Sequence, residues 1–202
     1  MSLSADLYHN FGRVQTNLLV EGFYTILDDV FALRDMDDAA DGGKVKERYN
    51  GSGATVRGFN VEGRAAFTRW FELQAGVTLQ QSRYKEPEFW SEDAEVPPVR
   101  RMFRTPDAYG YFTASFKPVR NFTADLSGTC TGSMLVQHMA GSGVAQDVAV
   151  STPSFFDMNI RLSYDVRIYK EITMQLYGGV QNLFNAYQKD FDKGVDRDSG
   201  YI

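Results

Sequence analysis

The amino-acid sequence predicts an all-β fold, an antiparallel up-and-down meander of about eight long strands. Apolar and polar residues alternate over long runs, and a strand places successive side chains on opposite faces. The runs come in pairs whose members are separated by a turn of only a few residues, and long polar segments separate the pairs. Each predicted strand therefore has one apolar side and one polar side.

The first hairpin is expected to run from about Leu3 to Asn10, to turn at Gly12-Arg13, and to return from Val14 to about Leu33. The segment from Asp35 to Gly53 is rich in Asp, Lys and Gly, so we expect a loop there.

The second hairpin is expected from Phe59 to Phe67, with a turn at Thr68-Arg69-Trp70 and a return from Phe71 to Leu79. A long loop should follow from about Lys85 to Pro106. Its prolines argue against a central strand because proline cannot donate to a ladder. These prolines are Pro87, Pro97 and Pro98.

The third hairpin is expected to begin near Ala108, to turn at Pro118-Val119-Arg120-Asn121, and to return from Phe122 to Met134. A loop of small and polar residues should follow from Met139 to Pro153.

The fourth hairpin contains the clearest alternation. It should turn near Tyr169-Lys170-Glu171 and return through Met174 to Tyr187. Its first strand has an apolar side made of Phe156, Met158, Ile160, Leu162, Tyr164 and Val166, and a polar side made of Asp157, Asn159, Arg161, Ser163 and Asp165.

Composition limits the class of protein. Hydrophobic residues make up 43% and charged residues 23% of the 202 residues, which excludes a disordered chain and is typical of one domain. The formal net charge of −5, without any basic stripe, argues against a nucleic-acid partner. No run approaches the roughly 20 apolar residues of a membrane helix.

Alternation alone does not say whether the apolar side meets lipid or a protein core. Strand length and the contrast between short turns and long loops favour a membrane-spanning β-barrel. Aromatic residues beside the short turns would form an interfacial girdle: Phe11, Phe67, Trp70, Phe71, Phe122 and Tyr169. A soluble β-barrel that binds an apolar small molecule, and a passive porin, remain alternatives.

Three segments resemble the late barrel of TonB-dependent receptors of Bacteroidetes-type bacteria. They are Asn17-Leu18-Leu19-Val20-Glu21-Gly22-Phe23-Tyr24-Thr25, Gly58-Phe59-Asn60-Val61-Glu62-Gly63 and Gly178-Gly179-Val180-Gln181-Asn182-Leu183-Phe184-Asn185. The resemblance covers most of the chain. It implies a C-terminal part of a larger transmembrane barrel in the cell outer membrane, in contact with outer-membrane lipid. The complete receptor would import a scarce extracellular solute with TonB as its partner.

The same resemblance leads us to expect a fragment. The plug domain, the TonB-binding segment, the early barrel and the last strand of the family have no counterpart here, and Met1-Ser2-Leu3 is interpreted as a start added for expression. A fragment would have two open strand edges, near Leu3–Asn10 and Met174–Tyr187, through which it would close on itself or self-associate.

No catalytic motif was found, so we expect neither an enzyme nor a cofactor. Cys130 lies in an alternating run and is expected to act as a small apolar group, while His9 and His138 are too far apart for a metal motif. Aspartates near Gly194 could hold Ca²⁺, but their spacing departs from an EF-hand, so we expect a solvated loop and no metal. These are Asp190, Asp192, Asp196 and Asp198.

Two sets of residues are candidates for binding. Aromatic and arginine side chains in or beside the second long loop could hold an anionic, planar or sugar-bearing ligand. Alternatively, they pack that loop into the barrel mouth. They are Tyr84, Trp90, Arg100, Arg101 and Arg104. Charged residues in the middle of strands are expected to face the barrel lumen, namely Glu62, Arg64, Asp157 and Arg161.

Overall fold

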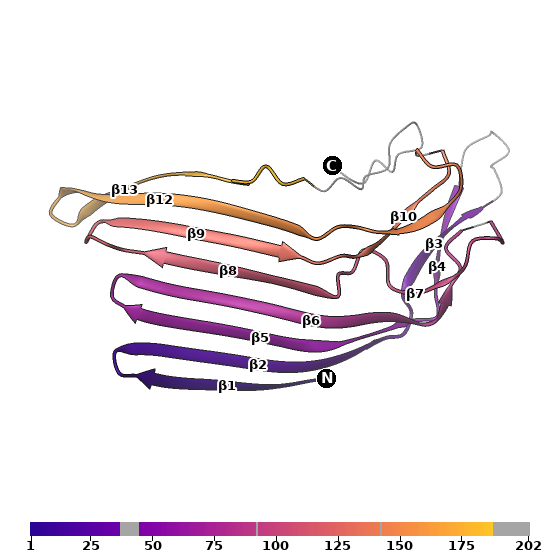
Figure 1. The fold of residues 1–202 in the computed structure, drawn as a ribbon, viewed down its shortest axis with the longest axis horizontal. Helices are drawn as coiled ribbons and strands as arrows, with labels where there is room; N and C mark the ends of the chain where they lie inside the picture. Colours follow the sequence, from indigo (N-terminus) through magenta and orange to yellow (C-terminus); the bar gives the residue numbers. More distant parts are fainter. Residues whose placement is uncertain (37–44, 92, 142, 188–202) are drawn as a thin grey trace.

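The computed structural model describes residues 1–36, 45–91, 93–141 and 143–187. Eight long antiparallel strands form one sheet in which each strand lies beside its neighbour along this path (Figure 1). They are β1 (Ser2–Phe11), β2 (Val14–Leu27), β5 (Ala54–Thr68), β6 (Phe71–Glu88), β8 (Ala108–Phe116), β9 (Phe122–Thr131), β12 (Phe155–Tyr169) and β13 (Ile172–Val180). The predicted fold class, an all-β antiparallel meander of eight strands, is confirmed.

The strand register gathers the apolar side chains on one face of the sheet. Directly opposed residues share a face, as Val20, Val61 and Val77 do across β2, β5 and β6. We call this the apolar face and the opposite one the polar face. Besides those valines, the apolar face includes Leu3, Leu7, Leu18, Phe59, Leu73, Leu79, Phe112, Leu126, Phe156, Met158, Ile160, Leu162, Leu176 and Val180.

No second layer covers the apolar face within the described residues. Among them, Ala54 is the one fully buried hydrophobic residue. Large side chains in the interior of this face are exposed, such as Leu79 at 55% and Val77 at 44% on β6. The described part of the chain is a single-layer sheet without a hydrophobic core, so its apolar side chains meet whatever surrounds the sheet.

The two ends of the sheet differ. At one end, short turns join β1 to β2, β5 to β6, β8 to β9 and β12 to β13; at the other end lie the long connections (Figure 1). Gly12 has a positive φ of 63°, which suits a tight hairpin turn. Aromatic rings cluster at the short-turn end, where Phe67 stacks on Phe71 at 5.4 Å and Trp70 meets Phe116 edge-on at 5.3 Å.

Two of the long connections contain hairpins that sequence reasoning missed. β3 (Phe31–Met36), which begins in the last residues of the expected returning strand, pairs with β4 (Val45–Asn50), which lies in the segment expected as a loop. The expected end of the returning strand at Leu33 was wrong, because β2 ends at Leu27 before the pair Asp28-Asp29.

The long connection between β9 and β12, which contains the second of these hairpins, and the one between β6 and β8 are also more ordered than expected. β10 (Leu135–His138) pairs with β11 (Val148–Ser151), and β7 (Val99–Arg101) pairs with the far end of β6. β9 ends at Thr131 rather than Met134, whose backbone N–H is bonded to the Thr152 hydroxyl instead of a ladder.

The last strand is shorter than expected. β13 ends at Val180 rather than Tyr187. Asn182 and Asn185 have positive φ values of 52° and 50°, and two left-handed residues so close together are incompatible with a continuing strand.

Glycines inside the strands lie opposite aromatic rings. Gly76 is the cross-strand partner of Tyr111, and Gly128 is the partner of Phe112. A Cβ at Gly128 would lie 2.4 Å from Phe112 Cε1, so the ring occupies the space that the missing side chain leaves. This pairing compensates the poor strand propensity of glycine.

Candidate ligand-binding site

The polar face carries hydrogen-bonded pairs between neighbouring strands. The Gln74 side-chain amide on β6 donates to Glu62 Oε1 at 2.6 Å and to the Tyr111 hydroxyl at 3.2 Å. Arg64 Nε donates to Glu72 Oε1 at 2.6 Å. These contacts fix charged and amide groups in place on the polar face.

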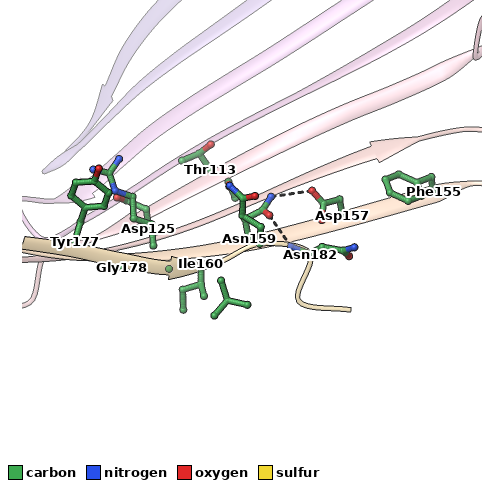
Figure 2. Close-up of a pocket in the computed structure, with 14 residues that line it drawn as sticks. Thr113, Asp125, Phe155, Asp157, Asn159, Ile160, Tyr177, Gly178 and Asn182 are labelled. Atoms are coloured by element: carbon green, nitrogen blue, oxygen red, sulfur yellow. Dashed lines mark hydrogen bonds between the residues drawn. The ribbon is translucent and has the colours of Figure 1, made fainter. Parts of the chain in front are cut away.

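A groove of about 1160 Å³ lies on the polar face where β8, β9, β12 and β13 run side by side (Figure 2). Figure 2 shows Asn159 and Asp157 on the groove side of β12, and Ile160 on the opposite side. Its polar lining consists of Thr113, Asp125, Ser127, Asp157, Asn159, Arg161, Tyr177, Gln181 and Asn182.

Asparagine side chains organise one end of the groove. The Asn159 amide donates to Asp157 Oδ2 at 3.1 Å, and Asn159 Oδ1 accepts the Asn182 backbone N–H at 2.9 Å. Asp157 Oδ1 is buried and has no hydrogen-bond partner in the described part of the chain. A buried acceptor without a donor is costly, which favours a water molecule or a ligand hydroxyl there.

A cation and an aromatic ring form the other end of the groove. The Arg161 guanidinium lies 4.6 Å from the centre of the Tyr177 ring. Within the described residues Arg161 makes no ion pair, although Asp125 is its cross-strand partner. The groove thus offers a carboxylate, amides, a guanidinium and a ring, a set suited to a polar solute with many hydrogen-bonding groups.

All four charged residues expected in the lumen lie on the polar face. Asp157 and Arg161 line the groove, whereas Glu62 and Arg64 lie on β5, outside it. That this face lines a lumen stays a prediction.

The loop candidates have their own contacts. The Trp90 ring meets Phe103 edge-on at 5.5 Å. Arg101 Nη2 donates to the Ser133 carbonyl at 2.8 Å and pairs with Asp107 at 3.0 Å. Trp90 Nε1 and Arg101 Nε are buried without a hydrogen-bond partner among the described residues. The Trp90 contact lies within the connection after β6, and the Arg101 contact joins this connection to the segment after β9. That these side chains pack the loop into a barrel mouth stays a prediction.

The remaining loop candidates differ in accessibility. Arg100 and Arg104 are exposed, and Arg100 Nη1 lies 3.4 Å from the Lys85 carbonyl. Burial raises the pKa of the Tyr84 phenol, the Glu88 carboxylate raises it further, and a hydrogen bond with the Phe103 backbone lowers it. The Tyr84 phenol therefore stays protonated at neutral pH.

Contacts between loops were not foreseen. The Tyr49 hydroxyl donates to Glu88 at 2.8 Å, and the Ser91 hydroxyl donates to Asp147 at 2.6 Å. These contacts link β4 to β6, and the connection after β6 to the one after β9. No pattern in the sequence pairs residues so far apart.

No metal site was found among the described residues, where no group of His, Cys, Asp or Glu is arranged to hold an ion. The aspartates near Gly194 lie outside those residues. His9 packs against the Phe11 ring at 4.3 Å. The described residues also contain no helix that is long and apolar enough to cross a membrane.

Comparison with known proteins adds one distant likeness. No protein-family model matches the chain, and no curated protein matches it. Among solved structures, the chain is similar to the siderophore receptor PirA from Acinetobacter baumannii, with a TM-score of 0.48 and 14% identity. The similarity covers 91% of this chain and 27% of that one. It concerns the fold alone.

Proposed function

We propose that the chain is part of the barrel wall of a TonB-dependent outer-membrane receptor, and that the complete receptor binds a scarce solute outside the cell and imports it. The observation that carries this proposal is the exposed apolar face. Between Phe11 and Leu3 on β1, and in the matching rows of the other strands, this face contains no Asp, Glu, Lys or Arg.

The height of the apolar face suits a membrane. From Leu3 to Phe11 the strand extends about 27 Å at the ordinary rise per residue. A tilt of about 40° reduces this to about 20 Å, close to the apolar band of about 25 Å in membrane barrels. Aromatic rings at the short-turn end support the same proposal, because such rings favour the membrane interface.

A soluble barrel fits the geometry less well. Such a barrel would enclose its apolar side chains, yet in the described part of the chain these side chains are exposed on an open sheet. The polar face instead carries paired charges and the groove, which suits the wall of a water-filled passage.

In this proposal the long loops capture the solute and the polar face guides it. Binding would be followed by a conformational change driven through TonB rather than by a covalent reaction. Arg161, Tyr177 and Asp157 are the wall residues that we propose to contact the solute or the plug of the complete receptor.

The test compares two arginine substitutions on opposite faces of adjacent strands. Met158→Arg puts a charge on the apolar face and should lower membrane insertion of the full-length protein, at a cost of about 2–4 kcal/mol near the bilayer centre. Thr129→Arg, on the polar face, is the matched control and should insert normally. The readout is the heat-modifiable folded fraction in outer-membrane preparations. Equal insertion of both variants, or the reverse ranking, would contradict the proposal.

A further inference from the structure

We propose that the apolar face carries a specific site for an anionic lipid with a phosphorylated headgroup, at the long-loop end of β1, β2, β5 and β6. This inference rests on the proposed function, since it assumes that the apolar face meets lipid. It adds a chemically defined partner at named residues.

A groove of about 630 Å³ lies at this place, lined by Leu3, Gly22, Phe59 and Leu79 of the apolar face and bordered by the strand residues Phe23, Gly58 and Gln80 of the polar face. Gly22, one of its lining residues, lies between Leu3 and Phe59 in one row of the apolar face, with Leu79 next in the row. Glycine leaves the space of a side chain open there, and its neighbours are well exposed, Leu3 at 79% and Phe59 at 64%. A flexible acyl chain fits such a depression better than a flat sheet surface.

Two arginines lie directly above the groove on the same face. Arg57 is the cross-strand partner of Gln81, and Arg83 is two residues further along β6. Such diagonal neighbours are about 7–8 Å apart. Arg57 Nε and Nη2 donate to Gln81 Oε1 at 3.2 and 2.7 Å, which holds the guanidinium over the groove and leaves Nη1 available.

The charges of these two arginines are not neutralised by the described residues. Asp107 also lines the groove but is paired with Arg101 at 3.0 Å. Asp28, at the end of β2, is paired with Lys85. Arg57 and Arg83 make no ion pair within the described part of the chain. Arginine binds phosphate oxygens through several N–H groups at once, so the pair complements a phosphorylated headgroup.

The apolar groove and the two arginines follow each other along the strands in the same order as the acyl chains and the phosphate group of a lipid. The row of Gly22, Phe59 and Leu79 would contact an acyl chain, and the next two rows carry Arg57 and Arg83. An inorganic anion would make no contact with the apolar groove. An uncharged lipid would offer no negative charge to the two arginines.

The first experiment removes the charge. The full-length protein, purified in detergent, is exposed to a mixture of lipid A and phosphatidylcholine, and retained lipids are counted by native mass spectrometry. Replacing Arg57 and Arg83 by Gln should lower lipid A retention about fivefold for each arginine, the usual strength of a surface cation near anionic lipid. Arg13→Gln and Arg69→Gln, at the short-turn end, are the matched controls and should retain lipid A.

The second experiment fills the groove without changing charge. Gly22→Val should lower lipid A retention, because its Cβ would occupy the groove, 3.5 Å from the Phe59 ring, without a clash. Gly63→Val, on the same face with nothing within 4 Å of its Cβ, should leave retention unchanged. Inorganic phosphate added to the wild type should not displace lipid A, whereas displacement would indicate a simple anion site and overturn the proposal.

Two kinds of failure are distinguishable. If the protein inserts into membranes but retains lipid A no better than the arginine variants do, the lipid site is wrong and the proposed function stands. If the wild-type protein does not insert, the proposed function fails and the lipid site fails with it.

Discussion

At the scale of single residues, aromatic rings pack over glycines on neighbouring strands. Gly76 lies opposite Tyr111 on the polar face, and a Cβ at Gly76 would lie 2.7 Å from Tyr111 Cε1. The Tyr111 ring covers the glycine, and its hydroxyl accepts a hydrogen bond from Gln74. One missing side chain thus permits both a close ring contact and a polar contact between β6 and β8.

We expect Gly76→Val to displace the Tyr111 ring and to destabilise the folded protein by about 1–3 kcal/mol, the usual cost of overpacking. The measurement is the midpoint of urea unfolding in lipid vesicles. Gly63→Val is the control, because a Cβ there meets nothing within 4 Å. An unchanged midpoint for Gly76→Val would show that the ring contact does not constrain the sheet.

Tyr84 predicts a pH dependence in the long loops. Its pKa is raised above 10.0, so the folded state favours the neutral phenol. This contribution to stability is fully present below pH about 10 and is lost as the pH rises past the folded pKa. Proteolysis of the loop after β6 should accelerate at high pH in the wild type, and less in Tyr84→Phe. Identical pH profiles would contradict this prediction.

At the scale of elements, β7 attaches the long connection between β6 and β8 to the edge of β6 through strand pairing. Its pairing with β6 and the Arg101–Ser133 hydrogen bond hold this connection against neighbouring segments, and the Trp90–Phe103 contact joins two parts of the connection itself. The sequence predicted a proline-rich loop here and offered packing into the barrel mouth as one interpretation. Neither the β7 pairing nor the Ser133 partner could be predicted, because both depend on contacts between distant segments.

Trp90→Ala should loosen this connection without affecting the sheet. The loss of the ring contact with Phe103 should speed proteolytic cleavage of the loop several-fold, while the heat-modifiable folded fraction stays at the wild-type level. Phe89→Ala is the matched control, because the neighbouring Phe89 side chain is 74% exposed. Equal cleavage of the two variants would mean that Trp90 does not anchor the loop.

At the scale of the whole molecule, the single-layer sheet has two faces of opposite character, and the residues that the structure describes form no hydrophobic core. Such a sheet is stable only if its apolar face is covered, because exposed apolar patches of this extent are rare on soluble monomers. Cys130, the one cysteine of the chain, lies exposed on the apolar face between β8 and β12. It can therefore report which face meets lipid.

In the proposed receptor, embedded in membranes, we expect Cys130 to resist a water-soluble maleimide, because a polar reagent does not enter the hydrocarbon layer. In a Cys130→Ser background, Thr129→Cys on the polar face should be labelled. Labelling is measured by mass shift before and after unfolding in detergent. Rapid labelling of Cys130 and protection of Thr129→Cys would contradict the assignment of the faces.

The order of the strands, their short turns and their two faces were encoded locally, because the alternation of a strand such as Phe155–Tyr169 repeats every two residues and needs no knowledge of distant partners. Other features exist only after folding. The β3–β4 and β10–β11 hairpins and the groove that joins Asp157 to Arg161 and Tyr177 depend on contacts between residues far apart in the chain. Such contacts leave no period in the sequence, so they could be found only from the folded arrangement.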